Sequence, residues 1–289
     1  MIDKVYNVTF LVLLYKNEIS TSTTLNTLLK SEIKYDNCKL VIWNNGPRNL
    51  NCKNTMPFKD IGLDVDIQET KNNESLAKIY NNVIKLVKSN KFVILDDDST
   101  LNKNYLQAAL NATERELCIP IITYKGNIEG PKCNGIIVDH TKVFFDANEQ
   151  LMAIGSGMVI GSKVVKDITN IYGATFDERF YLYGVDTTFC YRVNQFGTTD
   201  LRVIQGFEHS LSRLEDETEL VNAFRLKERT YDHALSLRYY TPWWKSSYCV
   251  IRIVVTHLKR KIIKKKTSIL LMDFIRAFIR GRHYRDNNG

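Results

Sequence analysis

The 289-residue sequence lacks features that mark several common protein classes. It has no run of about 18 uninterrupted apolar residues, which excludes an ordinary polytopic membrane protein. Residues 7–15 are apolar, but Lys16-Asn17-Glu18 follows them in place of the small residues of a signal-peptide cleavage site. The six cysteines form no CxxC pair, so we expect reduced, mostly buried thiols and no disulfide framework. These absences predict a cytoplasmic protein whose first apolar run is a buried strand.

Acidic residues become scarce toward the C-terminus. The whole sequence has 40 Lys and Arg against 32 Asp and Glu, but residues 225–289 have 16 basic and 4 acidic residues. Residues 1–224 hold the remaining 24 basic and 28 acidic residues. This uneven charge predicts two parts, a mildly acidic domain over residues 1–224 and a basic tail over residues 225–289.

Apolar runs and helical periodicity alternate through the first half of the chain. Strand-like runs occur at Val8–Tyr15, Lys39–Trp43 and Phe92–Leu95, while Leu76–Lys88 has apolar residues at helical spacing. This alternation indicates βαβ units, and therefore an α/β fold with a mostly parallel central sheet. Such sheets bind ligands at the carboxyl ends of their strands. We therefore expect the polar residues that follow these three strands to lie together at one edge.

Three consecutive acids, Asp96-Asp97-Asp98, directly follow one of these strands. Adjacent side chains of an extended segment point in opposite directions, so Asp96 and Asp98 can face one ligand while Asp97 faces away. Because the three acids repel one another, a divalent cation shared with a diphosphate is an obvious partner. The alternative is a solvated acidic turn, in which Ser99 or Thr100 caps the helix that follows.

Two later residues are candidates for the same chemistry. Asp186 follows an aromatic-rich stretch and a glycine, a setting in which partial burial raises the pKa of a carboxyl group toward useful basicity. His209 can supply a neutral imidazole to the cation. Each residue also has a plain alternative, a surface or capping acid for Asp186 and a structural histidine for His209.

Several short motifs follow one another in unbroken order over residues 7–210. They are Tyr15-x-Asn17-Glu18, Asn44-Asn45-Gly46, Asn73-x-Ser75-x-Ala77-x₃-Asn81, Asp96-x-Asp98, Gly155-Ser156-Gly157, Phe176-Asp177-Glu178-x-Phe180 and Asp186-x₅-Arg192, with Gly197 and His209 after them. This ordered set resembles family 2 glycosyltransferases with the GT-A fold. The closest likeness is to bacterial rhamnosyltransferase-like enzymes of O-antigen and capsule assembly. The resemblance implies a Rossmann-like nucleotide-binding sheet flanked by helices, here followed by a helical basic extension.

The resemblance also implies roles for individual residues. Asp186 would be the catalytic base, while Asp98 and His209 would hold Mn²⁺ or Mg²⁺. The donor sugar and the acceptor would lie beside Gly155, Ser156, Gly157 and Arg192. The donor nucleotide would be bound by Tyr15, Asn17, Glu18, Asn44, Asn73, Ser75, Asp96 and Asp97, with Asp96 near the ribose.

The sequence departs from the family's pattern at three positions. Asn44 stands where the family usually has an Asp that contacts the base, and Ser75 replaces a usual Gly. Val185 stands where a Glu commonly precedes the catalytic base, so one helper acid is missing. The departure at Asn44 leaves the identity of the bound nucleobase open.

The basic tail contains two apolar stripes at helical spacing, in residues 246–263 and 268–280, with Trp243-Trp244 just upstream. Cationic amphipathic helices with aromatic residues at the boundary are typical of segments that lie on an anionic membrane surface. Residues 240–289 are therefore expected to bind such a surface. The alternative is that both stripes pack on the catalytic domain or on a second subunit of a homo-oligomer.

The resemblance and the tail together predict an inverting hexosyltransferase at the inner face of a bacterial cytoplasmic membrane. It would move a sugar, such as rhamnose, from a dTDP-, UDP- or GDP-sugar to a lipid-linked surface glycan. A nucleotidyltransferase or another nucleotide-sugar enzyme is the first rival, but the N-terminal region lacks a Gly-rich phosphate loop with Lys or Arg. A nucleic-acid-binding protein is the second, and the mildly acidic residues 1–224 argue against it.

Overall fold

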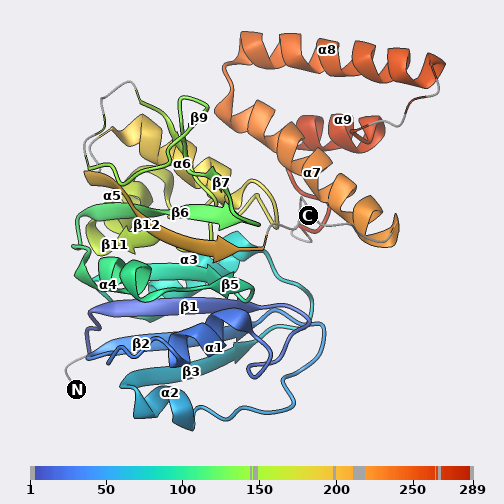
Figure 1. The fold of residues 1–289 in the computed structure, drawn as a ribbon. Coiled ribbons are helices and arrows are strands. Elements are labelled where there is room, and N and C mark those ends of the chain that lie inside the picture. Colours follow the sequence, from blue (N-terminus) through green and yellow to red (C-terminus); the bar gives the residue numbers. More distant parts are fainter. Residues whose placement is uncertain are drawn as a thin grey trace.

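A computed structural model of the chain describes residues 4–143, 145, 149–197, 200–210, 219–263, 265 and 268–286. The described residues form an α/β body around one central sheet, followed by three helices that lie to one side of it (Figure 1).

Nine described strands form the central sheet. They are β1 (Val8–Leu14), β2 (Cys38–Asn44), β3 (Leu63–Glu69), β4 (Lys91–Asp96), β5 (Ser99–Thr100), β6 (Glu116–Tyr124), β7 (Asn127–Gly130), β11 (Val159–Gly161) and β12 (Asp200–His209). Their order is β3-β2-β1-β4-β11-β6-β12-β5, and β7 pairs with β6. The pairs β1–β2, β2–β3, β1–β4 and β6–β12 are parallel, whereas β11 runs antiparallel to β4 and β6. The short strands β8 (Lys132–Cys133), β9 (Ile136–Ile137) and β10 (Leu151–Met152) form a second sheet.

Helices cover both faces of the central sheet. They are α1 (Thr23–Leu29), α2 (Met56–Asp60), α3 (Leu76–Leu86), α4 (Lys103–Asn111), α5 (Ser162–Tyr172) and α6 (Val185–Phe196). Side chains of β1 alternate between the two faces, as the period of a strand requires. Phe10 and Val12 join a core cluster with α1, α2 and α4, while Leu11 and Leu13 join a second cluster with α3, α5 and α6.

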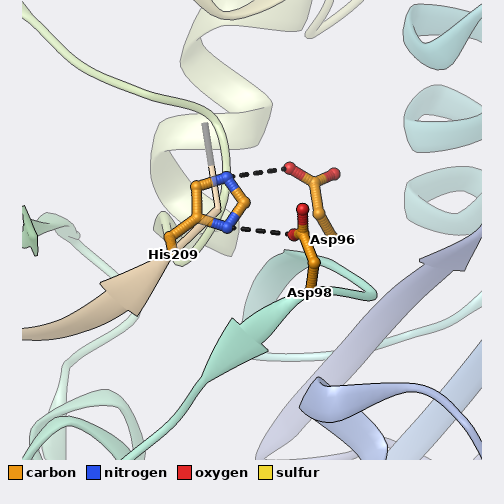
Figure 2. A group of neighbouring side chains, drawn as sticks. All are labelled: Asp96, Asp98 and His209. Atoms are coloured by element: carbon orange, nitrogen blue, oxygen red, sulfur yellow. Dashed lines mark ion pairs between the residues drawn. The ribbon is translucent and has the colours of Figure 1, made fainter. Parts of the chain in front are cut away.

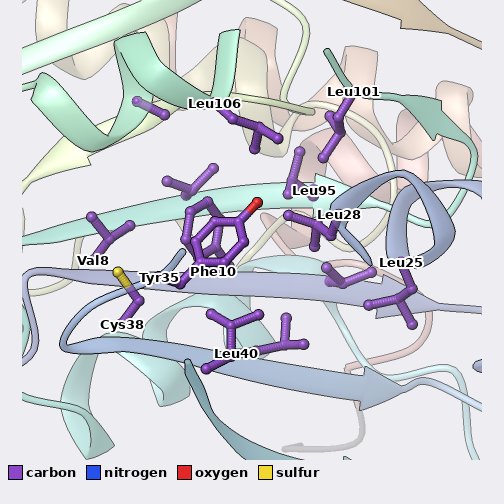
Figure 3. Packing of buried hydrophobic residues seen from close by; sticks show 14 of the residues in the cluster. Val8, Phe10, Leu25, Leu28, Tyr35, Cys38, Leu40, Leu95, Leu101 and Leu106 are labelled. Atoms are coloured by element: carbon purple, nitrogen blue, oxygen red, sulfur yellow. The ribbon is translucent and has the colours of Figure 1, made fainter. Parts of the chain in front are cut away.

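The first core cluster shows how the sheet is held to its helices (Figure 3). Phe10 of β1 meets Tyr35 edge to face, with ring centroids 5.6 Å apart. Leu40 of β2 and Leu106 of α4 are fully buried in the same cluster. Burying each such side chain stabilises the folded chain by about 1.5–3 kcal/mol. These contacts therefore hold the strands and helices that carry the polar residues in fixed positions.

Polar caps start three of these helices. Ser22 accepts a hydrogen bond from the main-chain N–H of Leu25 at the start of α1, and Ser75 accepts one from Lys78 at the start of α3. At the start of α4, the side-chain oxygen of Asn102 accepts from the N–H of Tyr105 at 2.9 Å. The alternative in which Ser99 or Thr100 caps this helix does not hold, because those residues are paired in β5. Caps of this kind contribute about 1 kcal/mol each.

Three helices follow β12, namely α7 (Glu219–Tyr240), α8 (Trp243–Ile262) and α9 (Leu271–Arg280). Helix α7 attaches to the sheet body, because Leu235 joins the second core cluster and the hydroxyl of Tyr240 donates to Asp177 at 2.8 Å. The expected boundary between residues 224 and 225 falls inside this helix. The division into domain and tail stays a prediction. Residues 264, 266–267 and 287–289 of the expected tail lie outside the described part of the chain.

The two predicted apolar stripes of the tail have different surroundings. In α9, Phe274 and Ala277 are fully buried against Tyr231 and Ala234 of α7. The stripe in residues 268–280 therefore packs largely inside the chain, as the alternative to a membrane surface expects, and its binding to a membrane stays a prediction. Helix α8 instead keeps much of its stripe exposed. In the part of the chain that the structure describes, no helix combines the length and the apolar character needed to cross a membrane.

Candidate active site

The carboxyl ends of β1, β2 and β4 lie side by side, as the sequence predicted. Leu14 of β1 is paired with Asn44 of β2, and Leu13 is paired with Asp96 of β4. The loops after β1 and β2 are joined directly, because the N–H of Lys16 donates to a main-chain carbonyl in the β2 loop at 2.9 Å. The polar residues that follow these strands therefore gather at one edge of the sheet.

His209 meets the acidic turn at this edge (Figure 2). It reaches the turn because β12 pairs antiparallel with β5, which places His209 opposite Ser99. The Nδ1 atom of His209 is 3.1 Å from Oδ1 of Asp98, and its Nε2 atom is 3.5 Å from Oδ2 of Asp96. One candidate ligand atom from each of these three residues lies within 4.8 Å of the other two. The three side chains can therefore share one metal ion.

Hydrogen bonds fix the shape of the turn. The N–H of Asp96 donates to Oγ of Ser156 at 3.1 Å, and the main-chain carbonyl of Asp97 accepts from the N–H of Thr24 at 3.2 Å. The carboxylate of Asp97 accepts from Nδ2 of Asn17 at 3.0 Å. Asp97 thus faces the loop after β1, away from His209. Because Asp97 and Asp98 lie in the turn between β4 and β5, this turn, and not an extended segment, separates the side chains.

The charges in this cluster shift one another's proton affinity. Burial raises the pKa of Asp96 to about 6; His209 opposes this rise, while Asp98, Asp97 and Asp186 add to it. Burial alone would lower the pKa of His209, but the carboxylates of Asp98 and Asp96 raise it above its ordinary value. Close carboxylates repel one another at neutral pH, so a bound divalent cation would stabilise this arrangement.

The residues present fit such a cation. Two carboxylates and an imidazole offer hard oxygen ligands and one nitrogen, a set suited to Mn²⁺ and acceptable to Mg²⁺. The Oδ1 atom of Asp98 is buried and lies 3.1 Å from Nδ1 of His209, which is also 3.1 Å from Oγ of Ser99. When the imidazole is neutral and its Nδ1 carries no proton, this oxygen accepts no hydrogen bond from the residues described, and coordination of a cation would satisfy it.

Asp186 lies beside this cluster, in the first turn of α6. Its carboxylate accepts a hydrogen bond from the N–H of Thr187 at 2.7 Å. A Cβ atom built on Gly155 would stand 3.5 Å from Cβ of Asp186, so the glycine lies directly against the acid. Burial raises the pKa of Asp186, and its hydrogen bonds with backbone N–H groups oppose the rise. The charge of Asp186 also raises the pKa of Asp96, so the two acids are close enough to interact electrostatically.

Two further ionisable residues lie close enough to Asp186 for its charge to affect them, and the sequence analysis did not single them out as site residues. Tyr80 of α3 is buried, and its pKa is raised well above the ordinary value by burial and by the charges of Asp96 and Asp186. Asp232 comes from α7, and a Cβ built on Gly184 would stand 2.0 Å from its Oδ1 atom. Burial raises the pKa of Asp232 to about 7, with Asp186 adding to the rise. The helical periodicity around residue 80 indicated only a core position, and no local motif marks residue 232.

Two of the expected donor-binding residues have partners inside the protein. The buried Asn44 donates from Nδ2 to the carbonyl of Arg48 at 2.7 Å and accepts from the N–H of Gly46 at 3.1 Å. The buried Ser75 donates to the carbonyl of Phe180 at 2.8 Å, which ties α3 to the segment before α6. Both side chains therefore hold loops at the site, and their expected contact with a nucleotide stays a prediction.

Three other expected donor-binding residues lie at the same edge of the sheet. Tyr15 is 42% exposed, so its ring is open to a ligand. The carboxylate of Glu18 accepts from the backbone N–H of Asn51 at 3.1 Å and from its Nδ2 at 2.8 Å. Asn73 has a left-handed φ of 48° and accepts from Asn45 at 3.3 Å. The contacts of Glu18 and Asn73 tie together the loops after β1, β2 and β3.

The residues expected beside the sugar and the acceptor fall into two groups. Gly155 lies against the catalytic candidate Asp186, whereas Gly157 packs against a ring, because a Cβ there would stand 2.6 Å from Phe207. Arg192 is buried and ion-paired with Asp177 at 3.2 Å, and its Nε donates to the hydroxyl of Tyr240 at 2.9 Å. Arg192 thus joins α6 to α7, and its expected contact with the sugar stays a prediction.

Comparisons with known proteins bear on the fold. No family model matches the sequence, and no curated protein matches it. Crystal structures of TarS from S. aureus are similar to the chain. One TarS structure is 14% identical over 81% of this chain and 44% of its own, with a TM-score of 0.51. TarS 1–349 in complex with UDP-GlcNAc is 14% identical over 81% of this chain and 67% of its own, with a TM-score of 0.54.

TarS 1–349 in complex with UDP is 14% identical, covers 94% of this chain and 80% of its own, and gives a TM-score of 0.53. This chain spans less than half the length of the longest of these TarS chains. At such low identities the likeness bears on the fold alone. Together with the order of the strands, it confirms the GT-A-like α/β fold that the sequence predicted.

Proposed function

We propose that this protein is a metal-dependent, inverting glycosyltransferase that moves a sugar from a nucleotide-sugar donor to an acceptor hydroxyl. The observation that carries the proposal is the convergence of Asp96, Asp98 and His209 at the carboxyl edge of the sheet, with Asp186 beside them. The fold supports the same class of donor, because similar TarS structures contain UDP and UDP-GlcNAc.

The donor half of the reaction needs little covalent chemistry from the protein. A nucleotide sugar already carries a good leaving group, so the site must mainly stabilise the departing diphosphate. Asp98 and His209 would hold Mn²⁺ or Mg²⁺, with Asp96 close enough to join them. When bound, such an ion supplies Lewis-acid stabilisation of the leaving oxygens. Asn17 and Asp97, which bond each other, would present the loop after β1 to the nucleotide.

The acceptor half of the reaction needs a base, and Asp186 is placed to serve as one. Burial raises its pKa, which makes its carboxylate a stronger base than an ordinary aspartate. Gly155 has no side chain to fill the space against it, which leaves room for an acceptor. Asp186 would take the hydroxyl proton while the acceptor oxygen attacks the anomeric carbon opposite the leaving diphosphate. A single displacement of this kind inverts the anomeric configuration.

The acceptor we propose is a lipid-linked saccharide of a growing surface glycan, at the inner face of the cytoplasmic membrane. Support comes from the cationic tail, whose helix α8 exposes apolar side chains. The resemblance in sequence favours a hexose such as rhamnose, and the similar TarS structures draw attention to UDP-GlcNAc. The donor therefore has to be identified by direct binding.

A thermal-shift screen with and without Mn²⁺ tests the donor half of the proposal. The screen uses dTDP-rhamnose, UDP-galactose, UDP-N-acetylglucosamine and GDP-mannose. We expect at least one donor to raise the melting temperature, and to do so more strongly with Mn²⁺ present. The absence of any metal-dependent shift, with UDP also failing to bind, would contradict the proposed function.

A further inference from the structure

Helix α8 carries an apolar face that the described residues leave uncovered. Its inner side is occupied, because Cys249, Val250 and Ile253 pack against the cluster formed by α7 and α9. Figure 1 shows α8 as the outermost of the three tail helices. On its outer side, seven apolar side chains are 44–81% exposed, and we call them the outer face: Trp243, Trp244, Tyr248, Ile251, Val255, Leu258 and Ile262.

The outer face is one continuous stripe. From Trp244 to Ile262 its members recur at intervals of four and three residues, which keeps them on one side of a helix with about 3.6 residues per turn. Single exposed apolar residues are ordinary on a protein surface, but a contiguous stripe of them marks a contact with something else. The length of the stripe therefore calls for a flat or elongated partner.

The charge around the stripe narrows the choice of partner. The 20 residues of α8 include no Asp or Glu, while Lys245, Arg252, Lys259 and Lys261 are exposed on it. A second copy of the same helix would bring like charges together, which costs free energy. An anionic lipid surface instead attracts these cations and accepts the apolar stripe at the same time. Two tryptophans at one end suit the boundary between headgroups and acyl chains.

We propose that the outer face of α8 docks the protein on an anionic lipid bilayer, with the apolar stripe in the headgroup boundary and the cations against lipid phosphates. The docking itself does not depend on the function proposed above. The benefit of docking does rest on that function, because a lipid-linked acceptor would lie in the same surface.

A truncation would test this proposal poorly. Removing residues 240–289 also removes the hydroxyl of Tyr240, which donates to Asp177, and takes away the buried Phe274 that packs on α7. Loss of vesicle binding by such a fragment could then follow from damage to α7. Substitutions on the exposed side of α8 avoid this problem, because they leave the inner contacts in place.

The first test uses the full chain and two matched triple variants. Ile251→Ser, Val255→Ser and Leu258→Ser together remove the centre of the outer face. Met56→Ser, Leu86→Ser and Ile171→Ser remove equally exposed apolar side chains from the sheet body and serve as the control. Binding is measured by sedimentation with vesicles of phosphatidylcholine, alone or mixed with phosphatidylglycerol.

We expect the wild type and the control variant to sediment with the mixed vesicles and to stay in solution with phosphatidylcholine alone. The outer-face variant should stay in solution with both. Equal melting temperatures of the three proteins exclude misfolding. Sedimentation of the outer-face variant with the mixed vesicles, at the level of the wild type, would overturn the proposal.

The second test changes charge and leaves the apolar stripe intact. Lys245→Gln, Arg252→Gln and Lys259→Gln together should weaken binding to the mixed vesicles about a hundredfold, since each cation near an anionic surface contributes about fivefold. Unchanged affinity would contradict the proposed charge contacts.

A different result would assign the outer face to a second copy of the chain. In that case the wild type would be a dimer in solution, the outer-face variant would be a monomer, and neither would bind vesicles. Neither test needs a sugar donor, so both outcomes are independent of whether the protein transfers sugars.

Discussion

Asp96 and Asp98 share one imidazole, and the physical reason lies in the turn between β4 and β5. Asp96 ends β4 and Asp98 directly precedes β5, and the turn leaves both acids facing His209 while Asp97 faces Asn17. Three acids in a row would be unfavourable without such a division. The cluster therefore concentrates negative charge on one side, where a divalent cation would lie between the acids and the proposed diphosphate.

Replacing Asp98 by Asn tests the metal assignment at the level of one atom. We expect Asp98→Asn to weaken the Mn²⁺-dependent binding of UDP by at least about tenfold, because a neutral amide is a poor ligand for a hard cation. Isothermal titration calorimetry with and without Mn²⁺ measures the effect. Glu208→Gln is the control, since this exposed acid precedes His209 on β12 and points to the other side of the strand. Equal affinities in wild type and Asp98→Asn would remove Asp98 from the metal site.

Replacing Asp186 by Asn separates the base from donor binding. The rate of sugar transfer should fall by about 10²–10⁴, the usual contribution of a general base, while the affinity for UDP in Mn²⁺ stays nearly unchanged. In the wild type, activity should decline toward acid with an apparent pKa above 3.8, because burial raises the pKa of this carboxyl group and the base must be unprotonated. Near-full turnover by Asp186→Asn would show that another residue is the base.

Asp232 gives a prediction about stability. Its pKa is raised from 3.8 to about 7, mainly by burial. Between these values the folded chain keeps a proton that the unfolded chain has lost, so the free energy of unfolding falls as pH rises through this window. Asp232→Asn should therefore melt at a higher temperature than wild type at about pH 8, and show no such gain at about pH 4. Asp60→Asn, an exposed position on α2, is the control, and a gain of equal size at both pH values would count against the assignment.

At the scale of elements, helix α7 packs closely against a glycine at the start of α6. Gly184 caps α6 with φ of 79°, and a Cβ there would stand 2.0 Å from Oδ1 of Asp232 and 2.6 Å from the ring of Phe180. Gly173 ends α5 with the same φ but has open space around it. The two glycines therefore separate the effect of backbone conformation from the effect of packing.

Alanine at these two positions should give unequal losses. Gly173→Ala should lower the free energy of unfolding by about 1–2 kcal/mol, the cost of a left-handed conformation for a residue with Cβ. Gly184→Ala carries the same cost and also displaces Asp232 and Phe180, so its loss should be clearly larger. Urea denaturation of both variants measures the difference. Equal losses of free energy of unfolding would mean that the contacts of Gly184 with Asp232 and Phe180 add no cost to the substitution.

The elements of the first half were predictable because their pattern is local. The strand expected at Val8–Tyr15 is observed as β1 and the helix expected at Leu76–Lys88 as α3, since apolar runs and helical periodicity reflect burial on nearby faces. The start of α4 differs from the alternative in which Ser99 or Thr100 caps this helix. Ser99 and Thr100 are good capping residues by type, but pairing with β12 places them in β5 and leaves the cap to Asn102.

The site was predictable only in part, for the same reason. The sequence analysis placed Asp96 and Asp98 on one side by the alternation of an extended segment, whereas a turn between β4 and β5 produces this division in the structure. The approach of His209 depends on strand pairing between segments 110 residues apart, which only the motif order indicated. Asp232 approaches Gly184 at the start of α6 through the packing of α7, and neither its sequence neighbours nor the composition of the tail signals that contact.

At the scale of the whole molecule, the end of the chain is tied to the segment that precedes Asp186. The buried Glu228 of α7 accepts a hydrogen bond from the hydroxyl of Tyr284 at 2.6 Å and lies 3.6 Å from a ring nitrogen of His283. The ring of His283 stacks on that of Tyr181, with centroids 4.4 Å apart. Counting charges predicted a domain and a tail as two parts. Such counts do not register individual contacts like these, which join residues 225–289 to the segment before α6.

The central claim is that a divalent cation at Asp98 and His209 holds the diphosphate of a nucleotide at the edge of the sheet. A crystal of the full chain grown with UDP and MnCl₂, measured at the manganese absorption edge, tests it most directly. The account predicts an anomalous peak within coordination distance of Oδ1 of Asp98 and an imidazole nitrogen of His209, with both phosphates of UDP on the other side of the ion. A peak elsewhere, or UDP bound away from these side chains, would contradict it.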